Sequence, residues 1–211
     1  MGRRLILVFL VVAGVLDGPG VRAAEVEIVD HGSGQIVLFS GAIQRADAAR
    51  IMAILDHSER IREVRFDSRG GSLESGIEIG EQIRAHRVAT RVTAGTVCAS
   101  ACVYAFLGGM IRVVDDGGRL GIHMASGAFN DDYLAAVKRV LLDPADTDID
   151  GKVRRIILIN EQFSAIAARR QARYLTQMGV SLRLLDPVFD TSHLDIHWLT
   201  PAELRDYNVV N

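Results

Sequence analysis

The spacing of apolar and polar positions changes repeatedly along the first half of the chain. Short runs rich in β-forming residues at 35–40, 61–67 and 89–97 predict strands. Between the first two, residues 46–55 place apolar side chains at helical spacing, and Ser72 can cap a helix that follows the second. Strands that alternate with helices across short, glycine-marked turns indicate βαβ units and a largely parallel sheet.

The same alternation continues before the chain turns helical. Residues 101–107 are small and apolar and predict a buried helix, and 111–114 and 120–123 predict short strands. Beyond them, 131–142 and 153–178 carry apolar residues at helical period, separated by an aspartate-rich loop. The second half of the chain is therefore expected to be helical.

Helix-boundary residues mark the last part of the chain. Gly179 is a C-cap for the long helix, and residues 181–189 predict another short helix. Thr200, Pro201 and Glu203 combine an N-cap, a first-turn proline and a capping box, so a last helix is expected to begin there.

Residues 1–23 have the three parts of a secretory signal peptide. Arg3 and Arg4 form a basic start, residues 5–16 are an almost unbroken apolar run, and Ala23 ends a small-residue cleavage site. An uncleaved membrane anchor is the alternative, but the apolar run is short for a bilayer span. We therefore expect the segment to be removed and the protein to be periplasmic or secreted.

Cleavage would leave residues 24–211 as a mildly acidic chain. It removes three arginines and one aspartate, which lowers the formal net charge from −2 to −4. A nucleic-acid-binding protein usually has a basic surface, so we expect no nucleic-acid partner. The remaining length suits a single domain, and no further apolar run predicts a stable membrane span after processing.

Gly70 and Gly71 stand between a predicted strand and a predicted helix. Paired glycines permit a turn with positive φ, and their N–H groups can point into a site, as an oxyanion hole requires. An ordinary tight turn is the alternative.

Ser100 stands where a strand meets a helix, among small neighbours that leave room for a sharp bend. A hydroxyl beside a backbone N–H can serve as a nucleophile with its own oxyanion donor, whereas a helix-capping serine is the alternative. His123 ends a predicted strand, and a neutral imidazole is the usual base for a serine, although a lone histidine is more often structural. The other histidines are assigned to loops or the surface: His31, His57, His86, His193 and His197.

Cys98 and Cys102 are the two cysteines of the chain. An exported protein with an even count can bridge them as a disulfide, or they can be two small buried hydrophobic residues. The sequence has neither a second cysteine pair nor a histidine pattern that would complete a zinc site, so we expect no metal and no cofactor.

Taken together, these motifs occur in an order that resembles the Clp protease proteolytic subunit and its crotonase-like relatives. The resemblance covers most of the mature chain. The exported variant with Cys-Ala-Ser-Ala-Cys is similar to bacterial periplasmic proteins of the same superfamily. Five segments carry it: the first strand and glycine turn at 35–42, the Gly-Gly turn at 67–71, the serine at 98–101, the histidine strand at 120–124, and the closing WLTPAELRDYNVV at 198–210.

This resemblance implies an α/β, crotonase-like fold, a repeated ββα superhelix with a mostly parallel sheet and a helical C-terminal half. It also implies that Ser100 is the nucleophile and His123 the general base, while the N–H groups of Gly71 and Ala101 hold the oxyanion. We therefore expect an exported serine hydrolase, a peptidase acting on peptide or protein substrates. Relatives assemble into rings or trimers, so a homo-oligomer is expected.

The third catalytic residue is where the chain departs from the family. The orienting aspartate of the family aligns with Ile196, and Asp195 lies beside it. Asp195 is our candidate, although a one-residue shift on a strand would turn the side chain to the other face. Asp190 and His197 are weaker substitutes, and a Ser–His dyad is the alternative.

Two other functions compete with hydrolysis. The first is a catalytically inactive binding or assembly module on the same fold. It is favoured by the absence of an acid at the aligned position, and by a disulfide that would either brace or obstruct the serine. A crotonase-branch acyl-CoA enzyme ranks last, because export would separate the protein from cytoplasmic CoA.

Overall fold

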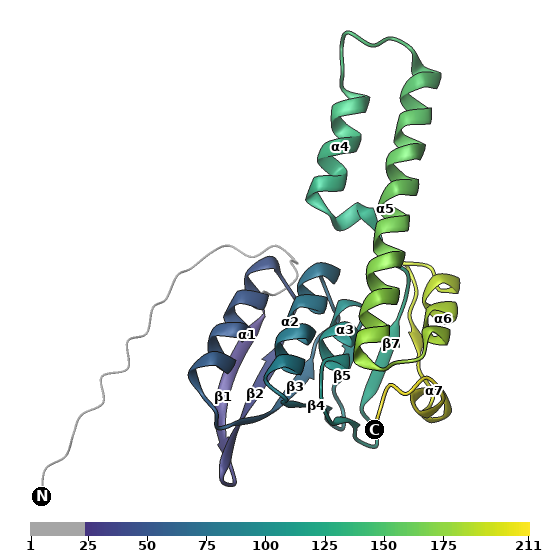
Figure 1. The fold of residues 1–211 in the computed structure, drawn as a ribbon. Helices are drawn as coiled ribbons and strands as arrows, with labels where there is room; N and C mark the ends of the chain where they lie inside the picture. The colour runs from purple at the N-terminus through teal and green to yellow at the C-terminus, as the bar shows by residue number, and fades with distance from the viewer. Residues whose placement is uncertain (1–23) are drawn as a thin grey trace, which may run out of the picture.

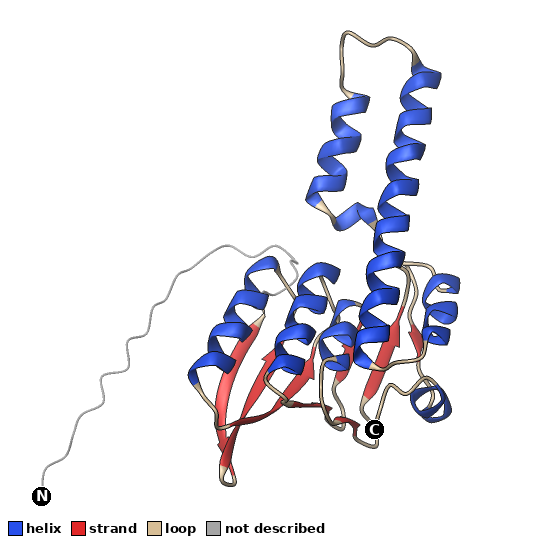
Figure 2. Ribbon diagram, viewed as in Figure 1, coloured by secondary structure: helices blue, strands red, loops and turns tan. Residues whose placement is uncertain are grey.

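The computed structural model describes residues 24–211, so the expected signal peptide lies outside the described residues. Its strands form two sheets, one with the order β1-β2-β3-β4-β6 and one with the order β5-β7-β8. Figure 2 shows helices α1, α2 and α3 side by side along one face of the strands. In chain order the elements are β1 (Glu25–His31), β2 (Gly34–Ser40), α1 (Arg45–His57), β3 (Ile61–Asp67), α2 (Leu73–Ala85), β4 (Ala89–Val92), β5 (Val97–Ala99), α3 (Ala101–Leu107), β6 (Arg112–Val114), β7 (Arg119–Ile122), the 3-10 turn η1 (Gly127–Phe129), α4 (Asp131–Leu141), α5 (Ile149–Met178), the 3-10 turn η2 (Leu182–Leu184), α6 (Leu185–Asp190), β8 (His197–Trp198) and α7 (Pro201–Asp206).

Parallel pairing dominates both sheets, which confirms the expected fold class. The pairs β2–β3, β3–β4, β4–β6 and β5–β7 are all parallel. Antiparallel pairing occurs at the β1–β2 hairpin and between β7 and β8. Because parallel strands end at the same edge of a sheet, the turns after β3, β5 and β7 are brought together there.

Most element boundaries follow the sequence signals. β3 and α3 have the predicted ends, and Ser72 caps α2 by accepting a hydrogen bond from the Ser75 amide. Gly179 ends α5 in the left-handed conformation with φ 68°. Thr200 and Glu203 form the predicted capping box of α7.

Two predictions about strands were wrong. Residues 89–97 form two strands in different sheets, because a turn at Gly95, with φ 79°, separates β4 from β5. The hydroxyl of Thr96 closes that turn by donating to the Thr93 carbonyl at 2.8 Å. The other error is an omission: β1 was not predicted, because most of its side chains are exposed and its apolar signal is weak.

The core fills the space between the five-stranded sheet and the helices. Ile51 of α1 and Ile79 of α2 are fully buried, and the rings of Phe39 and Phe66 on adjacent strands lie 5.8 Å apart. A fully buried isoleucine or phenylalanine side chain contributes roughly 1.5–3 kcal/mol to folding relative to an exposed one. These contacts fix the strands whose ends carry the candidate site.

The second half of α5 is attached to this core by buried hydrogen bonds. The Tyr174 hydroxyl donates to the Tyr104 carbonyl at 2.6 Å, and the Tyr104 hydroxyl donates to Oε1 of Gln171. All three side chains are buried. They fasten α5 to α3, the helix that follows Ser100.

The first half of α5 projects away from the sheets together with α4 (Figure 1). We call residues 131–166 the α4–α5 arm. No side chain of α4, which is described over its whole length, is buried. The Lys152 ammonium closes the tip by donating to the carbonyls of Leu141 and Asp143 at 3.1 and 2.9 Å. Exposed apolar side chains of the arm and its tip are Leu141, Leu142, Ile149, Val153, Ile157, Leu158 and Ile166.

Within residues 24–211, no helix combines the length and the apolar character needed to cross a membrane.

Candidate active site

Ser100 sits at a sharp elbow between β5 and α3. Its backbone has φ 56° and ψ −126°, a combination that costs a residue other than glycine on the order of 1–3 kcal/mol. Its amide donates to the Gly121 carbonyl at 2.8 Å, which ties the elbow to β7. The side chain makes no capping hydrogen bond to α3, so helix capping does not account for a serine here.

The Gly70-Gly71 turn packs directly against this elbow. A Cβ atom added to Gly70, where φ is 101°, would lie 2.6 Å from the Ser100 Cβ and 2.9 Å from the Ala101 nitrogen. One added to Gly71, where φ is 143°, would lie 2.2 Å from the Ile43 carbonyl oxygen. Only glycine fits at either position, because the serine elbow approaches Gly70 and the Ile43 backbone approaches Gly71, and because both have positive φ.

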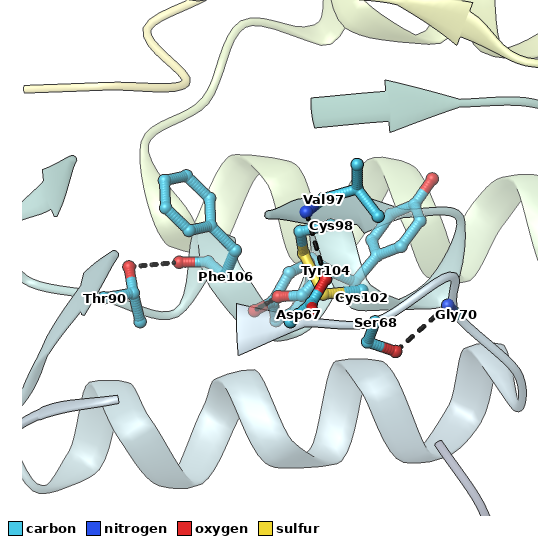
Figure 3. Close-up of a disulfide and its surroundings, with 10 residues drawn as sticks. Asp67, Ser68, Gly70, Thr90, Val97, Cys98, Cys102, Tyr104 and Phe106 are labelled. Atoms are coloured by element: carbon cyan, nitrogen blue, oxygen red, sulfur yellow. Dashed lines mark hydrogen bonds between the residues drawn. A yellow bond between two sulfur atoms is a disulfide. The ribbon is translucent and has the colours of Figure 1, made fainter. Parts of the chain in front are cut away.

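Two backbone amides beside Ser100 remain available to a ligand. The Gly70 amide is used internally, since it donates to the Ser68 hydroxyl at 3.1 Å (Figure 3). The amides of Gly71 and Ala101 make no hydrogen bond to any other residue that the structure describes. These are the two donors that the sequence predicted for an oxyanion hole, and they flank the serine from two different segments of the chain.

His123 directly follows β7, the strand that pairs with β5. The pairing of Ala99 with Gly121 places Ser100 and His123 at the carboxyl ends of neighbouring parallel strands. Nδ1 of His123 lies 2.9 Å from the Met124 carbonyl oxygen. Because a carbonyl can only accept, we assign the proton to Nδ1, which leaves the lone pair of Nε2 unshared.

The environment of His123 favours a neutral ring. Burial lowers the pKa of His123 below its ordinary value of 6.5; the hydrogen bond to Met124 opposes this shift, and His193 adds to it. At neutral pH the imidazole is therefore a base rather than a cation. The structure describes both Ser100 and His123, and no hydrogen bond joins them. The predicted catalytic pair therefore lie on neighbouring strands without a direct hydrogen bond.

His193 is a site residue that sequence reasoning missed. Its ring meets the His123 ring edge-on, with centroids 4.7 Å apart and planes at 75°. The Met124 amide donates to the Thr191 carbonyl at 3.0 Å, which holds the segment after α6 beside the end of β7. His193 does lie in a turn, one of the two places considered for it, but its contact with His123 was not predicted. Its only sequence signal was its place just before the segment where the family carries its acid.

The carboxylates considered for the third position lie elsewhere. Asp195 is exposed and accepts a hydrogen bond from the Ile196 amide at 2.8 Å. Ile196, the position at which the sequence resemblance predicts an acid, instead packs its Cγ2 against Gly121. Asp190 is exposed at the end of α6.

The remaining substitute, His197, pairs with Glu203, with Nε2 and Oε1 at 2.8 Å. Within residues 24–211, no hydrogen bond connects the ring of His123 to a carboxylate. The group that orients this ring is the Met124 carbonyl.

Cys98 and Cys102, which flank the elbow in the sequence, form a disulfide (Figure 3). Their Cα atoms are 5.2 Å apart, and both residues are fully buried. Of the two alternatives that the sequence left open, the bridged pair is the one found. It joins β5 to the first turn of α3, with Ser100 midway between.

Neither Ser100 nor His123 lines either of the two hollows that are described. The larger of two described hollows, about 370 Å³, is lined by residues of β1, β2, β3 and the turn after β4, and it includes neither Ser100 nor His123. The second lies at the other end of α2, beside His86. A ligand at Ser100 would thus lie along the shared edge of the strands.

Comparison with known proteins agrees with this arrangement at the level of the fold. No family model matches the chain, and neither does any curated protein. Among solved structures, ClpP1 from Listeria monocytogenes matches with a TM-score of 0.53 and 20% identity, over 83% of this chain and 88% of that one. A point mutant of the same protein matches with a TM-score of 0.51 and 23% identity over the same shares. The chain therefore has an α/β fold with mixed, mostly parallel sheets that resembles ClpP.

Proposed function

We propose that the protein is an exported serine hydrolase, a peptidase of the ClpP type, with Ser100 as nucleophile and His123 as general base. The observation that carries the proposal is the pair of unbonded amides, Gly71 and Ala101, on either side of the serine elbow. Ala101 is buried, and a buried amide is normally hydrogen-bonded within the protein, whereas Gly71 is exposed and can be reached by a ligand; the pair therefore favours a bound oxyanion.

The geometry supports an acyl-transfer sequence. Ser100 Oγ attacks the carbonyl carbon of the substrate while Nε2 of His123 takes the hydroxyl proton. The amides of Gly71 and Ala101 stabilise the oxyanion, and His123 returns the proton to the leaving amine. Water then hydrolyses the acyl-enzyme by the same steps. Ser100 and His123 must close to hydrogen-bond distance for this, as often happens only when substrate binds.

The proposed site is a Ser–His dyad in which a backbone carbonyl orients the histidine. The Met124 carbonyl fixes the tautomer of His123, a task that an aspartate performs in Ser-His-Asp sites. Asp195 is not needed for that task. Ser100 and His123 follow adjacent parallel strands, and an extended peptide along that strand edge is the substrate we propose.

The direct test is covalent labelling by a fluorophosphonate probe. The wild-type protein should be labelled at Ser100, and Ser100→Ala should not be labelled at all. Ser181→Ala is the matched control, because Ser181 only caps a 3-10 turn and should leave labelling intact. Equal labelling of wild type and Ser100→Ala would reject the proposal.

Export and assembly are part of the same proposal. We infer that residues 1–23 direct secretion, so the N-terminal sequence of the protein recovered from the periplasm or medium should begin at Ala24. The exposed apolar side chains of the α4–α5 arm support a homo-oligomer. Light scattering of the purified protein should give a mass above the monomer.

A catalytically inactive binding module is the second candidate. Two observations favour it: the Ser100 hydroxyl is not bonded to His123, and an isoleucine occupies the place of the acid. Failure of the folded protein to label, whether oxidised or reduced, would select this reading. Any peptide or ester hydrolysis that depends on Ser100 would exclude it.

A further inference from the structure

The elbow at Ser100 is strained in a way that helix ends do not explain. Three residues other than glycine have positive φ among residues 24–211: Arg87, Ser100 and Asn208. Arg87 and Asn208 each follow the C-cap of a helix, where left-handed residues are common. Ser100 precedes a helix, and its ψ of −126° lies outside the left-handed helical region. Something in its surroundings must hold it there.

The hydrogen bonds that hold this elbow to other strands act on one side of it. On the strand side, Ala99 donates to the Ser68 carbonyl at 2.9 Å and Ser100 donates to the Gly121 carbonyl at 2.8 Å. On the helix side, the amide of Ala101 makes no hydrogen bond to another described residue. The covalent link on that side is the disulfide from Cys98 to Cys102.

We propose that Cys98 and Cys102 are positioning residues, whose disulfide holds Ser100 and the Ala101 amide in the geometry that the hydrolase needs. The inference rests on the proposed function. Relaxing Ser100 toward an ordinary strand or helix conformation would move Cys102 relative to Cys98, and the bridge forbids that movement. The same movement would carry the Ala101 amide away from Gly71, so the bridge sets both the nucleophile and one oxyanion donor.

The proposal makes oxidation the step that completes the site. Two thiols transfer two electrons and two protons to an acceptor disulfide by thiol–disulfide exchange, and the acceptor leaves as a dithiol. In a reducing compartment the bridge does not form, so the elbow is relaxed and the hydrolase is inactive. After folding, both sulfurs are fully buried, so the bridge is shielded from thiol reductants and acts once, not as a reversible switch.

The test compares the oxidised full-length mature protein with Cys98→Ala/Cys102→Ala. Residue-resolved hydrogen exchange should show the amides of Ala99 and Ser100 exchanging about ten- to a hundredfold faster in the double variant, the scale expected for opening a short closed loop. Fluorophosphonate labelling of Ser100 should slow by a similar factor. The chain has no other cysteine, so wild type kept in reductant during folding is a second form of the same test without any substitution.

Gly32→Ala is the matched control for general loss of stability. Gly32 has φ 58° at the β1–β2 hairpin, with nothing within 4 Å of an added Cβ, and it lies at the opposite end of the strands from Ser100. This variant should leave exchange at the elbow and the labelling rate unchanged.

Three results would overturn the proposal. Unchanged exchange at Ala99 and Ser100 would mean that the elbow holds its shape unaided. Exchange raised equally in all elements would mean that the bridge stabilises the whole fold instead. Faster labelling without the bridge would mean that it obstructs the serine. If the oxidised wild type does not label at all, the hydrolase reading fails, while the exchange experiment still decides whether the bridge holds the elbow.

Discussion

The body of the protein and the α4–α5 arm are built on opposite principles. In the body, glycines contact the backbone of neighbouring turns, and Ile51 is completely buried. In the arm, no side chain of α4 is buried, and Ile157 on α5 is 51% exposed. The body thus encloses a core of its own, whereas the arm is mostly surface and presents apolar side chains that the single chain does not cover.

The two regions should therefore respond differently to substitution. A change in the body alters packing that nothing else can replace, so it should affect stability and the site together. A change in the arm alters a surface, so it should affect association and leave the fold intact. The predictions below begin with the change that should affect the body most.

Gly70→Ala should have the largest effect. The new Cβ would meet the Ser100 Cβ and the Ala99 carbonyl oxygen at 2.6 and 2.7 Å, and φ is 101°. We expect a loss of about 3 kcal/mol or more in the free energy of unfolding, and complete loss of fluorophosphonate labelling. Urea unfolding and probe labelling measure the two effects.

Gly95→Ala separates the cost of a side chain at positive φ from the cost of a steric clash with the serine elbow. Gly95 also has positive φ, at 79°, but nothing lies within 4 Å of an added Cβ. It should cost only about 1–2 kcal/mol, the backbone contribution, and keep labelling. If both variants lose the same free energy of unfolding and both are still labelled, the close contact between Gly70 and the serine elbow is not needed for activity.

Ile51→Ala and Ile157→Ala make the same chemical change in the two regions. Ile51 is buried among α1 and the sheet, so its truncation should cost about 3 kcal/mol. Ile157 is half exposed, so its truncation should change the free energy of unfolding by less than about 0.5 kcal/mol. Chemical denaturation measures both values.

Light scattering compares the effect of the same two substitutions on assembly. Ile157→Ala should lower the assembled mass, and Ile51→Ala should not do so at temperatures where it is folded. Equal costs of unfolding, or an unchanged mass in the arm variant, would contradict the contrast between body and arm.

Tyr174→Phe tests the joint between the two regions. It removes the hydroxyl that donates to the Tyr104 carbonyl and should cost about 1 kcal/mol. Tyr207→Phe is the control, because no hydrogen bond from the Tyr207 hydroxyl to another described residue is present, and it should be nearly neutral. A neutral Tyr174→Phe would mean that α5 is held by apolar packing alone.

His193→Gln should have the smallest effect, and only on pH dependence. Labelling of the wild type should be full above the pKa of His123 and fall as the pH drops through it, at a value below 6.5, because burial disfavours the protonated ring. Removing His193 removes a group that lowers the pKa of His123, so the acid limb should move to higher pH. A rate change with an unmoved limb would assign His193 a purely structural role.

The sequence predicted the fold well because its signals are local. Strand β3 is bounded by the residues that its alternation indicated, and Thr200 caps α7 as its pattern required. Small residues around Ser100 predicted the elbow, since only they allow such a bend. The Gly70-Gly71 turn was found for the same reason.

The features that the sequence did not predict depend on contacts between distant segments. β1 is stabilised by its partner β2 rather than by its own pattern. The split between β4 and β5 assigns neighbouring residues to different sheets, a tertiary effect that a continuous β-forming run conceals. The contact of His193 with His123 joins segments that are separated in the chain by α4, α5 and α6, so no local pattern predicts it.

The peptide oxygen of Met124 has a consequence for the conditions in which the protein can work. A carboxylate that steers an imidazole stops doing so once acid neutralises it, whereas an amide oxygen does not titrate over that range. The same oxygen carries no full negative charge, so it does less than a carboxylate to favour the imidazolium that forms during attack. Under the proposed mechanism the orientation of His123 is therefore independent of pH, and the acid limit of activity is set by protonation of the imidazole itself.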